Sequence, residues 1–160
     1  MNPELKHYNL IDFKEVMDKH GVKFVIIFGG LLGLVRGGEL IEWDYDLDVM
    51  CYRPDKVKIG GVIEDLKKLD FTPILPPEVP EHDTNFVRNG YKIEIWWFDE
   101  VGDEWKYDDK IRYKKEFFDE TEKIKFLDMD WDIPKNPKEF LTITYGESWV
   151  TPNKEGRYIL

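Results

Sequence analysis

The stretch VKFVIIFGGLLGLVRGGELIEWDYDLDVM, residues 22–50, decides the fold expected of this chain. Residues 22–28 are apolar and rich in β-branched side chains, which is typical of a strand buried on both faces of a sheet. The Gly29-Gly30 pair ends this strand, and the apolar LLGLVR that follows is long enough for one or two helical turns. A second apolar strand is expected over residues 47–52. This order of elements predicts an α/β domain.

Residue patterns outside this stretch predict further elements. Apolar side chains at three- and four-residue spacing predict amphipathic helices over residues 9–20 and 59–69. Two strand-like runs, 86–88 and 91–98, flank an Asn-Gly pair and predict a hairpin. Together these elements predict one α/β (α+β) domain over residues 1–160, with a mixed, mostly antiparallel sheet flanked by helices.

The remaining segments carry weaker signals. The proline-rich residues 73–80 are expected to form a loop, and residues 99–109 a charged turn. Residues 111–118 and 123–126 have the pattern of edge strands. Asn136, Pro137 and Glu139 predict a capped helix start, and that helix would end at Gly146.

Composition excludes several classes of protein. The chain has 160 residues with 33 Asp plus Glu against 23 Lys plus Arg, a net charge of −10, and 42% hydrophobic residues. A domain of this size buries about 70% of the surface of its unfolded chain, so the sequence is not that of a disordered protein. The acid excess, without a basic cluster, argues against bulk nucleic-acid binding.

Cellular location follows from what the sequence lacks. Cys51 is the only cysteine, so no internal disulfide or Cys/His zinc cluster is expected. There is no signal-like apolar run at the N-terminus and no apolar stretch long enough for a transmembrane segment. We therefore expect a cytoplasmic protein.

Three acids stand out in the segment WDYDLDVM, residues 43–50. If this segment is a strand, Asp44, Asp46 and Asp48 form a row of carboxylates on one face, roughly 7 Å apart per step. Such a row repels itself unless a cation neutralises it, and Mg²⁺ (or Mn²⁺) takes carboxylate oxygens together with substrate phosphates. The alternative is a solvated face of an edge strand.

A fourth acid lies in the segment YKIEIWWF, residues 91–98. Glu94 shares a strand face with Lys92 and Trp96, while isoleucines occupy the other face. If this strand neighbours the Asp46/Asp48 strand, Glu94 becomes the third carboxylate of a metal site and a candidate general base. Alternatively, Glu94 is an ordinary ion-pair partner of Lys92 or Arg88.

The glycine pair and a nearby arginine are candidate phosphate ligands. Backbone N–H groups of Gly29 and Gly30, at the start of a helix, could point at a phosphate. Arg36, about two turns on, could add a guanidinium fork. A tight turn and a surface arginine are the simpler interpretations of these residues, and the sequence lacks the Gly-Lys-Ser/Thr of a P-loop.

Taken together, the stretch GGLLGLVRGGELIEWDYDLDV, residues 29–49, closely resembles the signature of the LicD/fukutin family. In that family a small-residue pair, an LG-x-x-R segment and a W-D-x-D-x-D segment follow one another at this spacing. The tail IPKNPKEFLTITYGESWVTP, residues 133–152, is similar to the closing segment of the family. The resemblance spans about residues 24–152.

This resemblance implies a nucleotidyltransferase (polymerase-β-like) fold. It also implies transfer of phosphocholine or an alditol phosphate from a CDP-activated donor to a sugar hydroxyl of a glycan. By this resemblance, Gly29 and Gly30 match the turn that binds the donor phosphates. Asp46, Asp48 and Glu94 match the acids that bind the metal and carry out catalysis. Arg36 and Asp44 match residues that contact the substrate, together with Lys92 beside Glu94. The sequence departs from the usual pattern at Tyr45, and at Glu94, where Asp is usual.

Two other functions remain open at this stage. One is a small nucleotidyltransferase that moves NMP from an NTP to a protein or small molecule, and the other is a binding module that has lost catalysis. Retention of the glycine pair and the acids argues against the binding module. The chain is short for this family, which leaves room for a protein partner that supplies part of the acceptor surface.

Overall fold

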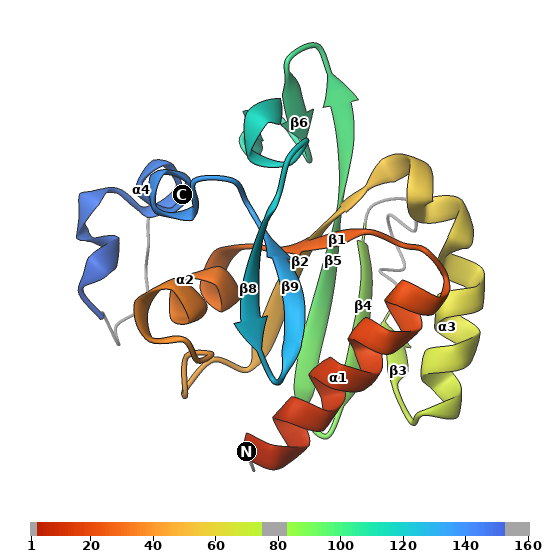
Figure 1. The fold of residues 1–160 in the computed structure, drawn as a ribbon. Helices are drawn as coiled ribbons and strands as arrows, with labels where there is room; N and C mark the ends of the chain where they lie inside the picture. Colours follow the sequence, from red (N-terminus) through yellow and green to blue (C-terminus); the bar gives the residue numbers. More distant parts are fainter. Residues whose placement is uncertain (1–2, 75–82, 153–160) are drawn as a thin grey trace.

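A seven-stranded sheet lies at the centre of the computed structural model, which describes residues 3–74 and 83–152 (Figure 1). Five strands follow the order β1-β2-β5-β4-β3, while β6 pairs with an extension of β5 and β7 pairs with β6. Strands β2 and β5 are parallel, and the other neighbours are antiparallel. The predicted α/β class and the mixed, mostly antiparallel sheet are confirmed.

The elements have the following bounds. The strands of the sheet are β1 Phe24–Ile26, β2 Asp46–Tyr52, β3 Thr72–Ile74, β4 Asp83–Arg88, β5 Tyr91–Val101, β6 Glu104–Lys106 and β7 Arg112–Lys114. A separate hairpin consists of β8 Glu122–Phe126 and β9 Met129–Ile133. The helices are α1 Pro3–Lys19, α2 Phe28–Gly37, α3 Ile59–Lys68 and α4 Pro137–Tyr145, with 3₁₀ turns η1 Arg53–Lys58, η2 Lys115–Phe117 and η3 Glu147–Val150.

One face of the central sheet is apolar and packs against α1. Alternate residues of β5 are fully buried on this face: Tyr91, Ile93, Ile95 and Trp97. The ring of Phe13 in α1 lies 5.5 Å from Phe24 of β1 and 6.4 Å from Phe86 of β4. The polar residues of β2 and β5 are therefore left on the opposite face, where period-two alternation places them.

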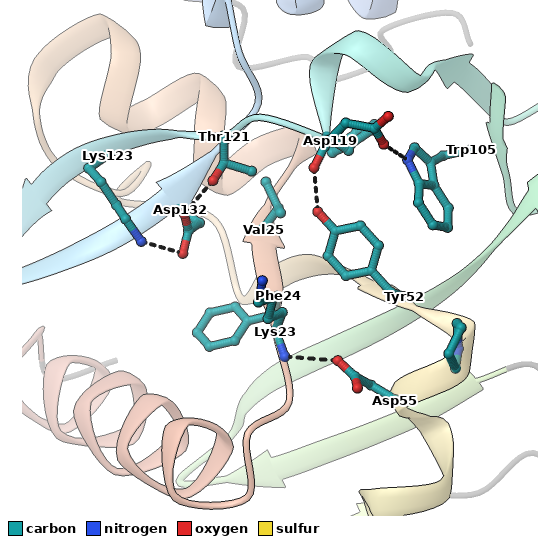
Figure 2. A pocket seen from close by; sticks show the side chains of 12 residues that line it. Lys23, Phe24, Val25, Tyr52, Asp55, Trp105, Asp119, Thr121, Lys123 and Asp132 are labelled. Atoms are coloured by element: carbon teal, nitrogen blue, oxygen red, sulfur yellow. Dashed lines mark hydrogen bonds and ion pairs between the residues drawn. The ribbon is translucent and has the colours of Figure 1, made fainter. Parts of the chain in front are cut away.

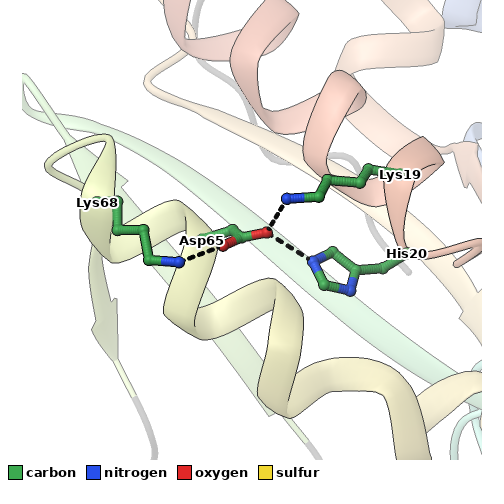
Figure 3. A network of polar contacts seen from close by, with 4 residues as sticks. All are labelled: Lys19, His20, Asp65 and Lys68. Carbon is green, nitrogen blue, oxygen red and sulfur yellow. Dashed lines mark hydrogen bonds and ion pairs between the residues drawn. The ribbon is translucent and has the colours of Figure 1, made fainter.

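Helices α1 and α3 lie side by side at the β3/β4 side of the sheet, while α2 and α4 lie together at the other side (Figure 1). Asp65 of α3 joins the first pair. Its carboxylate lies 2.6 Å from Lys19 Nζ, 2.9 Å from His20 Nε2 and 2.7 Å from Lys68 Nζ (Figure 3). These contacts hold the pKa of Asp65 well below its usual range.

The region after residue 98 differs from the expected charged turn. Strand β5 continues to Val101, which pairs with Glu104 across a tight turn at Gly102, whose φ is +62°. The expectation of a turn was wrong because the end of β5 and the short strand β6 are rich in charged residues. In β6, Glu104 and Lys106 flank a single buried residue, Trp105. The edge strands expected over 111–118 and 123–126 are present in shorter form as β7 and β8, and β9 was not predicted.

Two other expectations need correction. Pro73 lies in β3 rather than in a loop, paired with Phe86 at the sheet edge, where a missing N–H is tolerated. The rest of the proline-rich segment lies outside the described residues. Asn136 precedes α4 with φ +51° and makes no side-chain cap, so the predicted capping box does not form. Its backbone N–H instead donates to Glu122 Oε1 at 2.7 Å.

Candidate active site

The polar face of the sheet brings the predicted acids together on two neighbouring strands. In the parallel register of β2 and β5, Asp48 pairs with Glu94 and Asp46 pairs with Lys92. Paired residues on adjacent strands are about 5 Å apart and project to the same side. The strands are therefore adjacent, as the expected role of Glu94 requires.

Asp44 occupies a different place from the one expected. It precedes β2, which begins at Asp46, so only Asp46 and Asp48 form the strand row. The Asp44 carboxylate lies against the first turn of α2, since a Cβ placed on Gly29 would be 2.5 Å from Asp44 Oδ2. Gly29 is thus the residue that lets this carboxylate approach the helix start, where negative charge is favourable.

Burial and mutual repulsion weaken the acidity of this group. Burial raises the pKa of Asp44 to about 7, and Asp46 adds to the shift. Burial raises the pKa of Asp48 to about 8, and Asp46 and Glu94 push in the same direction, while a hydrogen bond from Trp96 Nε1 at 2.8 Å opposes them. The surroundings therefore favour the protonated forms of Asp44 and Asp48 over their charged forms.

Two lysines supply positive charge near the acids. Lys92 Nζ forms an ion pair with Glu94, and the hydrogen bond between them raises the pKa of Lys92. Lys6 of α1 is only 8% exposed, and its ammonium donates to the carbonyl oxygens of Ile41 at 3.2 Å and Asp44 at 3.1 Å. Lys6 thus lies beneath the loop that leads into β2.

Lys6 was not predicted as part of the site. A lysine near the start of an amphipathic helix reads as a solvated residue, and its partners are 35 and 38 residues away in the sequence. Tyr91 completes the support of this loop, since its hydroxyl donates to the carbonyl oxygen of Asp46 at 2.7 Å and its ring lies 4.8 Å from Lys6 Nζ. Only the pairing of α1 with this loop reveals the arrangement.

Trp96 and Asn85 also belong to this face of the sheet. The Trp96 ring packs edge-on against Phe28, with centroids 5.4 Å apart, and against Tyr107 at 4.8 Å. Asn85 of β4 is the cross-strand neighbour of Glu94, and its buried Oδ1 has no hydrogen-bond partner among the described residues. Neither Asn85 nor the Trp96 hydrogen bond to Asp48 has a signal in the sequence.

The proposed phosphate ligands have packing roles in this structure. A Cβ on Gly30 would be 2.6 Å from Leu47 Cδ1, so this glycine permits α2 to pack on β2. Arg36 Nε donates to the carbonyl oxygen of Trp149 at 2.6 Å, and Nη2 reaches that of Thr151 at 3.2 Å. Arg36 therefore tethers the C-terminal segment to α2, and its contact with a donor phosphate stays a prediction.

The acid site offers carboxylate oxygens to a divalent cation. No three His, Cys, Asp or Glu side chains in ranges 3–74 and 83–152 converge in a ready metal site. However, Asp46, Asp48 and Glu94 share one face of adjacent strands, and their oxygens are ligands that Mg²⁺ prefers. Burial and the neighbouring carboxylates raise the pKa of Asp48, so a cation beside it would favour its charged form. The chemistry of these residues therefore fits such an ion.

Comparison with known proteins agrees with this geometry. The family model for the "LicD/FKTN/FKRP, nucleotidyltransferase domain" matches residues 21–136. Human "Ribitol 5-phosphate transferase FKRP" is 23% identical over 150 residues, which cover 82% of this chain and 29% of that protein. An uncharacterised protein of Rickettsia typhi is 27% identical over 150 residues, covering 89% of this chain and 46% of its own length. The chain thus spans less than half the length of these relatives.

Solved structures share the fold at low sequence identity. The lincosamide antibiotic adenylyltransferase LnuA superposes with a TM-score of 0.57 and 10% identity, covering 85% of this chain and 83% of its own. The protein ANT(2")-Ia, solved in complex with adenylyl-2"-tobramycin, gives a TM-score of 0.57 at 7% identity, covering 81% of this chain and 69% of its own. The predicted nucleotidyltransferase fold is confirmed. Within the described ranges, no helix is both long and apolar enough to cross a bilayer.

Proposed function

Because the chain belongs to the LicD/FKTN/FKRP family of nucleotidyltransferase domains, we propose that it transfers a phospho-substituent from a CDP-activated donor to a sugar hydroxyl of a glycan. The substituent would be an alditol phosphate or phosphocholine. The observation that carries the proposal is the register of β2 and β5, which sets Asp46, Asp48 and Glu94 on one face. The start of α2 lies beside them through the contact of Asp44 with Gly29.

The reaction is a displacement at phosphorus. The acceptor oxygen forms a new bond to the phosphorus that bears the alcohol, the bond to the bridging oxygen of the pyrophosphate breaks, and CMP leaves. Such transfers need mostly positioning and charge neutralisation. In this proposal, Glu94 orients the acceptor hydroxyl and takes its proton. In the described structure Lys92 forms an ion pair with Glu94, and in this proposal the Lys92 ammonium turns toward a donor phosphate before Glu94 accepts the proton.

Mg²⁺ or Mn²⁺ would be held by Asp46 and Asp48, with Glu94 as a third ligand. When bound, the ion would neutralise charge that develops on the donor phosphates. Gly29 and Gly30 lie in the first turn of α2, and their backbone N–H groups would bind a donor phosphate there, because a helix start favours an anion. The Asp44 carboxylate lies at the same helix start, so a donor phosphate bound there would compete with it for the N–H groups.

The test is a product assay. The protein is incubated with Mg²⁺ and either CDP-ribitol, CDP-choline, CTP or ATP, with and without glycan acceptors. CMP release from a CDP-alcohol supports the proposal, and Asp46→Asn should abolish it. The matched control is Asp130→Asn, since Asp130 forms an exposed ion pair with Lys125 on the separate hairpin.

Other products would indicate another function. Pyrophosphate release from ATP or CTP would identify an NMP transferase, which needs the same fold and acids. Absence of any metal-dependent thermal shift with nucleotide, together with no product, would identify a binding module instead. Equal activity of wild type and Asp46→Asn would refute the assignment of the acids.

A further inference from the structure

A cavity of about 560 Å³ lies beyond the end of β2, and none of the residues assigned above to the acid site lines it (Figure 2). Its walls come from β1, from the end of β2, from β6 and from the β8–β9 hairpin. Its volume falls within the range of small-molecule sites. Elements far apart in the sequence thus meet around a space large enough for a ligand.

Two carboxylates in the polar lining of this cavity are already oriented. Asp119 accepts a hydrogen bond from Trp105 Nε1 at 2.8 Å. Asp132 accepts from Thr121 Oγ1 at 2.5 Å and from Lys123 Nζ at 2.7 Å. The Asp132 side chain remains 30% exposed and that of Asp119 46% exposed. A carboxylate offers about four acceptor sites, so each has capacity left for a donor from a ligand.

Aromatic rings form the apolar part of the wall. Tyr52 and Trp105 pack edge to face with centroids 4.9 Å apart. The Tyr52 hydroxyl donates to the carbonyl oxygen of Phe118 at 2.6 Å, which fixes the ring and leaves its apolar surface at the cavity. Rigid rings beside oriented acceptors match a ligand that has both C–H surface and many hydroxyl groups.

The charge of the lining argues against a nucleotide. The charged side chains are Lys23, Asp55, Asp119, Lys123 and Asp132, so three acids outnumber two bases. The Lys123 ammonium already donates to Asp132. The backbone N–H of Lys23 donates to Asp55. Asp55 also pairs with Lys58, outside the lining, and Asp132 with Lys123. The residues that line the cavity therefore offer no cluster of cations for a phosphate, and a neutral polyol needs none.

The cavity is separate from the acid site. Tyr52 and Asp48 share a face of β2 and lie about 13 Å apart along the strand. Met50, which lies between them on this face, is fully buried, so a ligand in the cavity does not extend along this face to Glu94. We infer that the cavity binds a neutral sugar or alditol as a site of its own.

Binding can be measured without catalysis. Saturation-transfer NMR is recorded on the full chain with ribitol and with a panel of neutral trisaccharides, maltotriose, cellotriose and chitotriose. We expect at least one of these probes to receive saturation. Asp132→Ala should weaken its binding at least tenfold, and Lys123→Ala, which changes a side chain that is 58% exposed, should weaken it less. The matched control is Asp130→Ala on the same strand but outside the cavity.

Further arms separate this inference from the proposed function. Asp46→Asn should leave the saturation transfer unchanged while it abolishes CMP release. Polyol binding without CMP release from any CDP-alcohol would support the cavity as a polyol site and refute the transferase proposal. The inference is wrong if no probe binds, or if Asp132→Ala and Lys123→Ala both bind the probe as wild type does.

Discussion

Replacement of Lys6 by methionine tests whether a buried ammonium holds the acid loop. The change keeps most of the apolar stem but removes two hydrogen bonds to the carbonyl oxygens of Ile41 and Asp44. Hydrogen bonds from a charged donor contribute about 1.5–3 kcal/mol each, and the contact with the Tyr91 ring at 4.8 Å adds about 0.5–2 kcal/mol. Release of a buried charge offsets several kcal/mol of this loss.

The expected net loss for Lys6→Met is about 2 kcal/mol in the free energy of unfolding, which corresponds to a fall in Tm of roughly 4–8 °C. We expect turnover to fall more than tenfold, because the loop that carries Asp44 and leads to Asp46 loses its support. Urea denaturation and the CMP-release assay measure the two effects. The control is Lys14→Met in the same helix, which breaks an i,i+4 pair with Asp18 and the contacts of the Lys14 ammonium with the Phe24 and Trp131 rings. It should cost about 1 kcal/mol and leave turnover unchanged, because none of these contacts involves the acid loop.

A Lys6→Met protein with the stability and turnover of wild type would refute this reasoning. It would mean that water satisfies both carbonyl groups and that the loop needs no cation. A loss of stability with unchanged turnover would limit Lys6 to a structural role.

The remaining predictions concern pH and three glycines. Contacts with cations depress the pKa of Asp65 in the folded state. They therefore stabilise the fold at pH values above the unfolded-state pKa, and this contribution is lost as pH falls through the folded-state pKa. On acidification, the Tm of Asp65→Asn should fall less than the Tm of wild type. Gly33→Ala should lower the free energy of unfolding by about 1–3 kcal/mol, since its Cβ would lie 2.6 Å from the backbone oxygen of Glu39. A Cβ on Gly37 meets nothing within 4 Å, so Gly37→Ala should be neutral or stabilising. Urea denaturation measures both variants. Gly29→Ala should displace the Asp44 carboxylate and lower turnover more than Gly37→Ala does; equal turnover in both variants would contradict the proposed contact.

Local patterns were sufficient where one face of an element is buried. The apolar alternation in residues 91–98 predicted both the strand and its faces, because period-two burial follows directly from strand geometry. The Asn-Gly turn at residues 89–90 was confirmed, with φ of +55° and +74°. Short charged segments were harder, since β6 and β9 have only 3 and 5 residues and place charged side chains beside their few buried apolar ones.

The sequence by itself determined the fold class, the order of elements around residues 22–50, and the acids that lie on β2 and β5. Tertiary structure alone decided which of these residues meet. The parallel register placed Asp48 beside Glu94, and the packing of α1 placed Lys6 beneath the acid loop. The reason is physical: spacing along a strand fixes which side a residue faces, but contacts across 35 or more residues depend on how separate elements pack.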